Sequence, residues 1–149
     1  MADAATISVT ATMLPDEIAK TITGSMTVTP SDANHKWYYK LTSVTNTSND
    51  LIGGSYSNYT ALADSTATQT VAVTDTVAFL WIQNTDASAD VYVNIAAGTA
   101  AAAAGNITVG AGETWYARLG LTLAGSIHAI SSTSTVTCIV CAMFDDVSV

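Results

Sequence analysis

Charged side chains, and basic ones above all, are scarce in this chain of 149 residues. Only 11% of the residues are charged, against roughly 25% in typical soluble domains. The basic residues are Lys20, Lys36, Lys40 and Arg118. Nucleic acids and anionic membranes are recognised through clustered Lys and Arg, which four scattered residues do not supply. We therefore expect no nucleic-acid or membrane partner, and a net charge of −8 that favours solubility.

Long apolar runs are missing as well. No segment approaches the roughly 18 consecutive apolar residues of a membrane-spanning helix. The first residues lack both the basic region and the continuous apolar region of a secretory signal. The sequence therefore predicts neither a membrane-spanning helix nor a secretory signal.

Cysteine is limited to Cys138 and Cys141, in the segment TCIVCAM. A zinc ribbon needs a second cysteine pair, which the chain does not have. In an extended strand, residues three positions apart point to opposite faces, which also disfavours a disulfide. The spacing predicts two free thiols used as small apolar side chains, with no metal or cofactor.

Catalytic patterns are equally sparse. Only His35 and His128 could serve as a histidine base, the first in an expected turn and the second on an expected strand. No serine lies in a Gly-x-Ser-x-Gly elbow. The alternating polar run at 84–90 lacks the glycine and the final glutamate of a calcium-binding loop, so turn chemistry explains it better. We therefore expect no enzyme activity, and a hydrolase is the least favoured class.

Threonine, serine and small apolar residues alternate along most of the chain, and this period of two is typical of β-strands. About half of the residues are apolar, which is enough to form a core. Candidate strands separated by turn signals follow one another every 8 to 12 residues, roughly as in all-β sandwiches and barrels. The expected strands are 6–13, 21–30, 35–44, 68–75, 76–84, 90–96, 106–110, 113–119, 125–131 and 134–144.

This pattern predicts an all-β fold, an antiparallel β-sandwich of jelly-roll-like type, with an N-terminal arm or extension. The whole chain, 1–149, is expected to be one β domain. Residues 1–15 are a candidate arm, with a possible helical turn at 14–20. Residues 1–60 differ in composition from the rest, so they are either an extension of a core sandwich at 61–149 or part of it.

Aromatic residues outside the expected core are the candidate binding residues. Trp37, Tyr38 and Tyr39 are consecutive, so strand alternation puts at least one ring on each face of a sheet. Tyrosine near a glycine-rich loop is typical of contact surfaces. The candidate interface residues are Trp37, Tyr38, Tyr56, Tyr59 and His128.

The second half of the chain resembles small virion proteins of tailed bacteriophages. The resemblance rests on FLWIQNTDASADVYVNIA, NITVGAGETWYARL and GSIHAISSTSTVTCIVCAMF, and covers about residues 75–145. It implies a β-sandwich virion component, most like a capsid decoration (cement) protein. No catalytic residues come with this resemblance.

Together these features predict a phage virion structural protein that stabilises the head by bridging capsid subunits. Its expected partners are the major capsid protein or other virion proteins, and its own copies in a homo-oligomer, with a trimer favoured. Its expected location is the virion, assembled in the host cytoplasm. The alternative is a neck, tail or fibre-associated adhesion or carbohydrate-binding module, in which Tyr56 and Tyr59 would stack on a sugar.

Overall fold

The computed structural model describes residues 4–13, 20–32, 34–57, 68–102 and 106–146. The chain forms two compact units, residues 1–32 and residues 33–149, which we describe separately. The first unit ends at Asp32. Most of the helical turn expected at 14–20 lies outside the described residues, and its last residue, Lys20, begins a strand.

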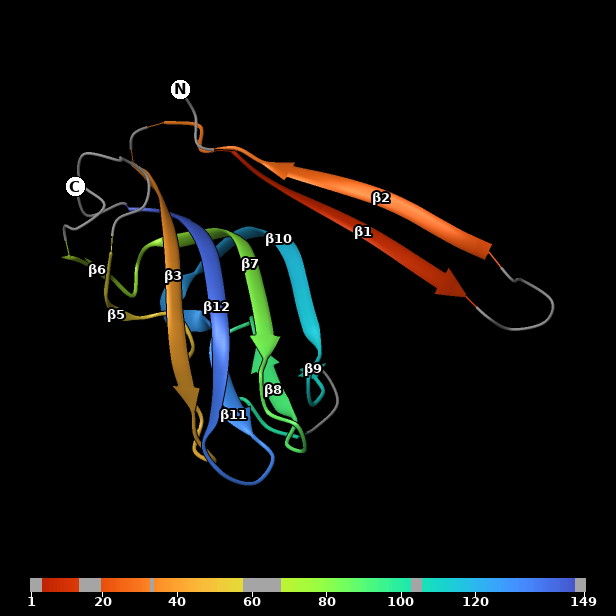
Figure 1. The fold of residues 1–149 in the computed structure, drawn as a ribbon. Helices are drawn as coiled ribbons and strands as arrows, with labels where there is room; N and C mark the ends of the chain where they lie inside the picture. Colours follow the sequence, from red (N-terminus) through yellow and green to blue (C-terminus); the bar gives the residue numbers. More distant parts are fainter. Residues whose placement is uncertain (1–3, 14–19, 33, 58–67, 103–105, 147–149) are drawn as a thin grey trace. The chain divides into compact units, whose positions relative to one another are not determined.

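The first unit is a β-hairpin of strands β1 (Ala5–Met13) and β2 (Lys20–Val28), paired antiparallel along their whole length (Figure 1). Both strands alternate hydroxyl and mostly apolar residues, and their register pairs like with like across the hairpin. The two faces of the hairpin therefore differ in chemistry. On one face every cross-strand pair consists of hydroxyl residues, from Thr6 opposite Thr27 to Thr12 opposite Thr21. The other face carries the apolar pairs, and we call it the apolar side of the hairpin. Its central pairs are Ala5–Val28, Ile7–Met26, Val9–Gly24 and Ala11–Ile22.

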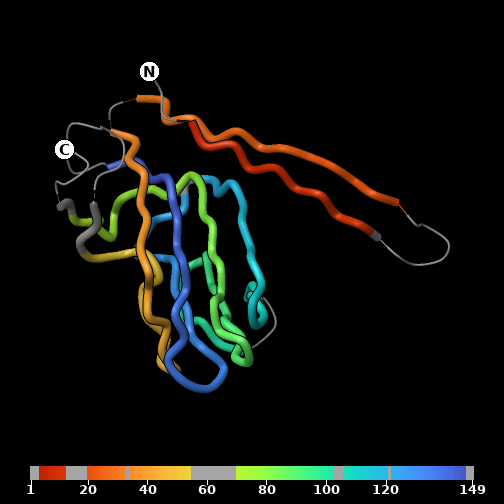
Figure 2. The backbone as a smooth tube through the Cα atoms, viewed as in Figure 1, coloured from red at the N-terminus to blue at the C-terminus, as the bar shows by residue number. Residues whose placement is uncertain are grey.

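The second unit consists of antiparallel sheets, as the alternation predicts. One four-stranded sheet has the order β10-β7-β12-β3, and its long strands run side by side (Figure 2). A second four-stranded sheet has the order β4-β11-β8-β9, and β5 pairs with β6. The strand bounds are β3 His35–Val44, β4 Asn49–Asp50, β5 Gly54–Ser57, β6 Thr68–Val71, β7 Thr76–Asn84, β8 Val91–Asn94, β9 Ile107–Val109, β10 Thr114–Leu123, β11 His128–Ser131 and β12 Val136–Asp145.

Side chains from both four-stranded sheets form one core. Leu80 and Ile82 of β7 and Val140 of β12 are fully buried, and so are Val91 and Val93 of β8. These residues alternate with more exposed ones along their strands, so each sheet turns one face inward. The prediction of an all-β chain with antiparallel sheets is confirmed.

Two local features refine the expected strand pattern. The long apolar stretch at 68–84 is interrupted before Thr76, where the buried Asp75 carboxylate accepts a hydrogen bond from the N–H of Ala72 (2.8 Å). The Asn- and Gly-rich segment at 46–58, expected to be only a loop, contains the short strands β4 and β5. The only helix among the described residues is the 3-10 turn η2 (Ala124–Ser126), so none of them forms a helix that could span a membrane.

Candidate functional site

The outward face of the β10-β7-β12-β3 sheet carries three rows of side chains that the strand registers place next to one another. The middle row runs from Tyr39 through Cys141 and Trp81 to Tyr116. The rows on either side are Leu41–Ile139–Gln83–Thr114 and Trp37–Met143–Phe79–Arg118. We call the apolar side chains of the first two rows the outer aromatic face: Tyr39, Leu41, Trp81, Tyr116, Ile139 and Cys141.

Large apolar side chains on this face are open to solvent in the single chain. Leu41 is 60% exposed and Tyr39 is 47% exposed, both on the edge strand β3. Trp81, Tyr116 and Ile139 are half-buried. Contiguous apolar patches on soluble proteins commonly mark sites of interaction, so this face is the leading candidate for a binding surface.

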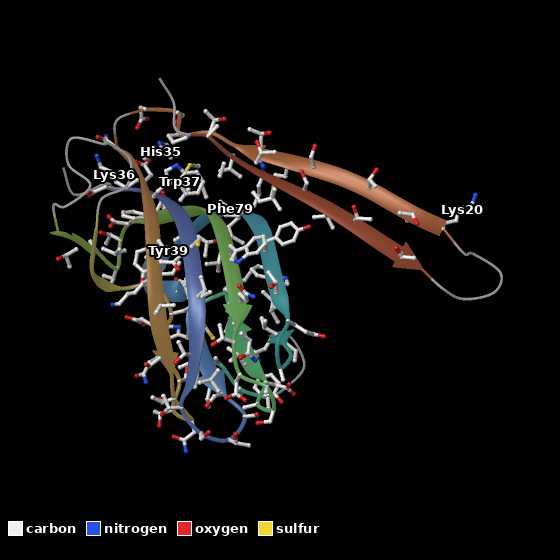
Figure 3. The ribbon with its side chains drawn as sticks, viewed as in Figure 1. Lys20, His35, Lys36, Trp37, Tyr39 and Phe79 are labelled. Atoms are coloured by element: carbon white, nitrogen blue, oxygen red, sulfur yellow. The ribbon has the colours of Figure 1, made fainter. Side chains whose placement is uncertain are left out.

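Aromatic contacts hold the rings of this surface in fixed positions. The rings of Trp81 and Tyr116 are stacked, with centroids 5.3 Å apart and planes at 19°. Trp37 packs edge-on against Phe79 at 6.2 Å (Figure 3). Rings that neighbours already orient lose little conformational entropy when a partner binds, which favours contact.

The three rows are almost free of charge, and the carboxylate of Asp145 lies in the row beyond Trp37 and Met143. Arg118, at the end of one row, is the only charged side chain in the three rows. On a chain of net charge −8, a region without carboxylates is where another acidic protein meets the least electrostatic repulsion.

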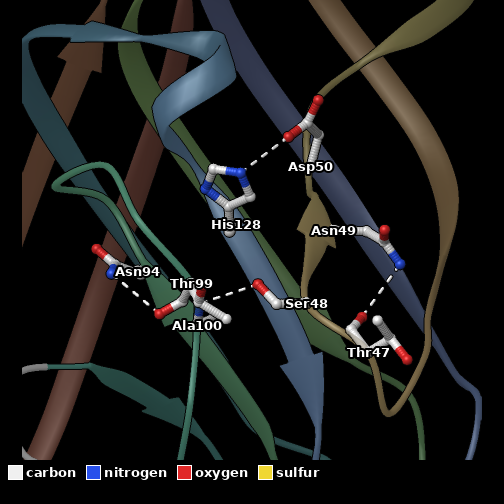
Figure 4. Close-up of polar contacts among 8 residues, drawn as sticks. All are labelled: Thr47, Ser48, Asn49, Asp50, Asn94, Thr99, Ala100 and His128. Carbon is white, nitrogen blue, oxygen red and sulfur yellow. Dashed lines mark hydrogen bonds and ion pairs between the residues drawn. The ribbon is translucent and has the colours of Figure 1, made fainter.

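His128 lies on the outward face of the other sheet, in β11, and its side chain is 23% exposed. Its Nε2 atom lies 3.1 Å from Oδ1 of Asp50 in β4 (Figure 4). Its second ring nitrogen, Nδ1, is buried and has no hydrogen-bond partner among the described residues. In a catalytic triad, one histidine nitrogen contacts an acid and the other contacts the nucleophile. Here Nε2 contacts the acid, Asp50, and no described residue is hydrogen-bonded to Nδ1.

Short polar contacts around this pair order the neighbouring loops. Ser48 Oγ accepts a hydrogen bond from the N–H of Ala100 (2.9 Å), as Figure 4 shows. The Asn94 amide donates to the carbonyl of Thr99 (3.4 Å), and that of Asn49 donates to the carbonyl of Thr47 (3.1 Å). The contacts link chain segments to one another, which is a structural role.

His35 begins β3 instead of lying in a turn, and it pairs with Asp145 of β12. Both line a shallow hollow of about 330 Å³ whose other walls are mostly apolar. The other lining residues are Thr76, Val77, Ala78, Leu119 and Gly120.

The polar run at 84–90 is folded as a hydrogen-bonded loop. The amide of the buried Asn84 donates to the carbonyls of Ala89 (2.7 Å), Val109 (3.2 Å) and Gly110 (3.1 Å). Oδ1 of Asp86 accepts from the N–H groups of Ser88 and Ala89, both at 2.8 Å, and from the Ser88 hydroxyl. These bonds, the Ser88 N–H first, lower the pKa of Asp86. The loop's oxygens are thus engaged by the protein itself.

The cysteines lie on opposite faces of β12, as their spacing predicts. Cys138 is fully buried in the core, and Cys141 is half-buried on the outer aromatic face. Burial raises the pKa of the Cys138 thiol to about 11 and also raises that of Cys141. Thiols held in the neutral form are poor nucleophiles and poor metal ligands.

The residues predicted to form an interface differ in how far they are exposed to solvent. Trp37 is half-buried beside the outer aromatic face. Tyr38 is only 1% exposed, so its selection as an interface residue is corrected: it faces inward opposite the small Ala142, which leaves room for its ring. Burial raises the pKa of its phenol. Tyr56 lies in β5, where side chains are not described, and Tyr59 lies outside the described residues.

Sequence reasoning did not identify Trp81, Tyr116 and Leu41 as a surface. Each was assigned to a strand, but their alignment depends on pairing between β3, β7, β10 and β12, which are far apart in the chain. The alternation HKWYYKLTSV did place Tyr39 and Leu41 together on one face, and that part of the signal was available.

Comparison of the chain with protein-family models, curated proteins and solved structures gives no significant match. The site is therefore interpreted from its own geometry.

Proposed function

We propose that this protein is a structural component that works by binding other folded proteins through the outer aromatic face. The observation that carries the proposal is the row of Tyr39, Trp81 and Tyr116, an exposed, preoriented and nearly uncharged aromatic surface. Aromatic residues are enriched in protein interfaces and supply much of their binding energy.

The setting we propose for this activity is a bacteriophage virion, with the protein as a capsid decoration protein. The resemblance over residues 75–145 supports this setting, and so do the two sheets with a shared core, which suit a β-sandwich of jelly-roll type. The protein would bind the major capsid protein as a homo-oligomer, with a trimer favoured. Because it would bind only the assembled shell, mass action would stabilise that shell.

The test uses capsid shells from particles in which mass spectrometry detects the protein. The protein is stripped from the shells and added back, and bound protein and the shell's melting temperature are measured. Readdition should restore the melting temperature. Leu41→Lys should weaken binding at least about tenfold, because a lysine charge would be desolvated in the contact. Thr108→Lys, at an exposed position of β9, should bind like the wild type.

Two results would overturn the proposal. One is the absence of the protein from purified particles, and the other is equal binding by the Leu41→Lys and wild-type proteins.

The stacked Trp81–Tyr116 pair favours one second candidate, a carbohydrate-binding module. The outer faces and edges of such a stacked pair are aromatic surfaces that a sugar ring could contact. A glycan array with wild-type protein and the Trp81→Ala variant distinguishes the candidates. Binding to a glycan that is lost in the variant supports the module, and an array without binding removes it.

A further inference from the structure

The apolar side of the hairpin is the second apolar surface of the chain. Ile22 is 53% exposed, and Ile7, Val9 and Met26 are half-buried. A two-stranded ribbon has no second layer of its own, and isolated hairpins are only marginally stable in water. The consistent separation of apolar and hydroxyl residues over both strands therefore indicates a ribbon with one face suited to packing against another body.

The distribution of charge favours a second copy of this chain as the binding partner of the hairpin. The strands of the hairpin contain no acidic residue, and neither do the three rows around the outer aromatic face. Two copies of a chain with net charge −8 repel one another over most of their surfaces. Contact between copies is least opposed where these two carboxylate-free apolar surfaces meet.

The dimensions of the two surfaces also match. Strands of nine residues make a ribbon of about 30 Å by 10 Å, a footprint of roughly 300 Å². Four strands span about 19 Å, and the two rows that contain Tyr39 and Leu41, with their margins, cover a similar area. One contact then removes about 600 Å² from solvent, counting both sides, which is small for a stable interface. Two copies that exchange hairpins make two such contacts with each other, about 1,200 Å² in one interface, which is the lower end of stable interfaces.

We propose that the apolar side of the hairpin of one chain binds the outer aromatic face of a second copy. Each chain gives one hairpin and receives one, and such contacts between unlike surfaces form a ring when the rotation between neighbouring copies closes. The inference rests on the proposed function in one respect only, namely that the outer aromatic face binds protein.

The first test measures self-association of the full chain by sedimentation velocity over a range of concentrations. Wild-type protein should form a closed oligomer. Ile22→Lys should raise the dissociation constant by more than about 100-fold, because it would bury an unpaired charge. Thr23→Lys, the next residue along on the hydroxyl face, should associate like the wild type. A monomeric wild-type protein, or equal effects of the two variants, would overturn the proposal.

The second test identifies the contact itself. A benzophenone side chain replaces Ile22 in chains of natural isotope composition, which are mixed with equal amounts of ¹⁵N-labelled wild-type chains and irradiated. The proposal predicts cross-links from position 22 to ¹⁵N-labelled peptides of β3, β7 or β12. Cross-links confined to the same chain, or to the hairpin of another copy, would contradict it. Benzophenone at position 23 is the matched control and should give few cross-links.

The two proposals can fail separately. Self-association through Ile22 without binding to shells would support the hairpin contact between copies and refute the virion role. A monomeric protein that binds shells through Leu41 would support the virion role and refute the hairpin contact between copies.

Discussion

Asn84 is a side chain whose loss should affect a large part of the fold. It is fully buried, its amide donates to three carbonyls from two loops, and its Oδ1 accepts the N–H of Asp86 at 3.0 Å. The side chain therefore joins the loop after β7 to the β9–β10 turn. Buried polar groups that lose their partners are costly, so the contribution of such a residue exceeds that of an exposed asparagine.

Replacing Asn84 by alanine should lower the free energy of unfolding by about 2–4 kcal/mol, because the carbonyls of Ala89, Val109 and Gly110 lose a donor and the first two of these bonds are buried. Chemical denaturation of the purified variant measures this loss. The control is Asn94→Ala, which removes solvent-exposed hydrogen bonds with Thr99 and Ala96 and should cost less than about 1 kcal/mol. Equal stability losses for the two variants would show that the Asn84 network is not important.

Asp86 should make the protein sensitive to acid. Its folded-state pKa is lowered, chiefly by the N–H of Ser88, so its ionised form stabilises the fold above the ordinary pKa of roughly 3.9. This contribution is lost as the pH falls through the lowered folded-state pKa. Asp86→Asn keeps an oxygen acceptor but cannot titrate. Its melting temperature should therefore fall less between about pH 5 and pH 2 than that of the wild type. Parallel pH profiles would disprove this role.

At the scale of elements, close approach of backbone segments fixes the turn between β10 and β11. Gly125 of η2 donates its N–H to the carbonyl of Val73 at 3.1 Å. A Cβ atom at Gly125 would lie 2.8 Å from the Cβ of Val73, which is too close for a real contact. The segment before β7 and the turn after β10 are therefore packed without space for a side chain.

Gly125→Ala should destabilise the protein by about 1–3 kcal/mol, since the two segments must separate to accommodate the methyl group. Gly120→Ala is the matched control: a Cβ there meets no atom within 4 Å, so its effect should stay within about 0.5 kcal/mol. Thermal unfolding of both variants provides the comparison. If Gly125→Ala is as stable as Gly120→Ala, the close packing is not a constraint.

Strand identity was predictable, and strand partners were not. Alternation located strands such as β3 and β7 within their observed bounds, because the period of two is a local property. Which face of β3 enters the core depends on its pairing with β12, about a hundred residues later. This explains why Tyr38 was chosen for the surface while Trp81 and Tyr116 were not. The same distant pairing places β3 in the second unit, although residues 1–60 share a composition.

At the scale of the whole molecule, the apolar side chains on the surface support the proposal that this chain functions in an assembly. The outer aromatic face and the apolar side of the hairpin both expose large side chains, while charge is concentrated elsewhere. Such a distribution lowers solubility unless the surfaces are covered, so it is expected of a protein that functions in an assembly.

Hydroxyl-radical footprinting tests most directly whether the outer aromatic face is a contact surface. The protein is labelled as a dilute purified chain and in its native assembly, and oxidation is quantified by mass spectrometry. Oxidation of Tyr39 and Trp81 should fall several-fold on assembly, while Tyr92, on the outward face of the other sheet, should change little. Equal oxidation of Tyr39 and Trp81 in both states would contradict the proposed role of this face.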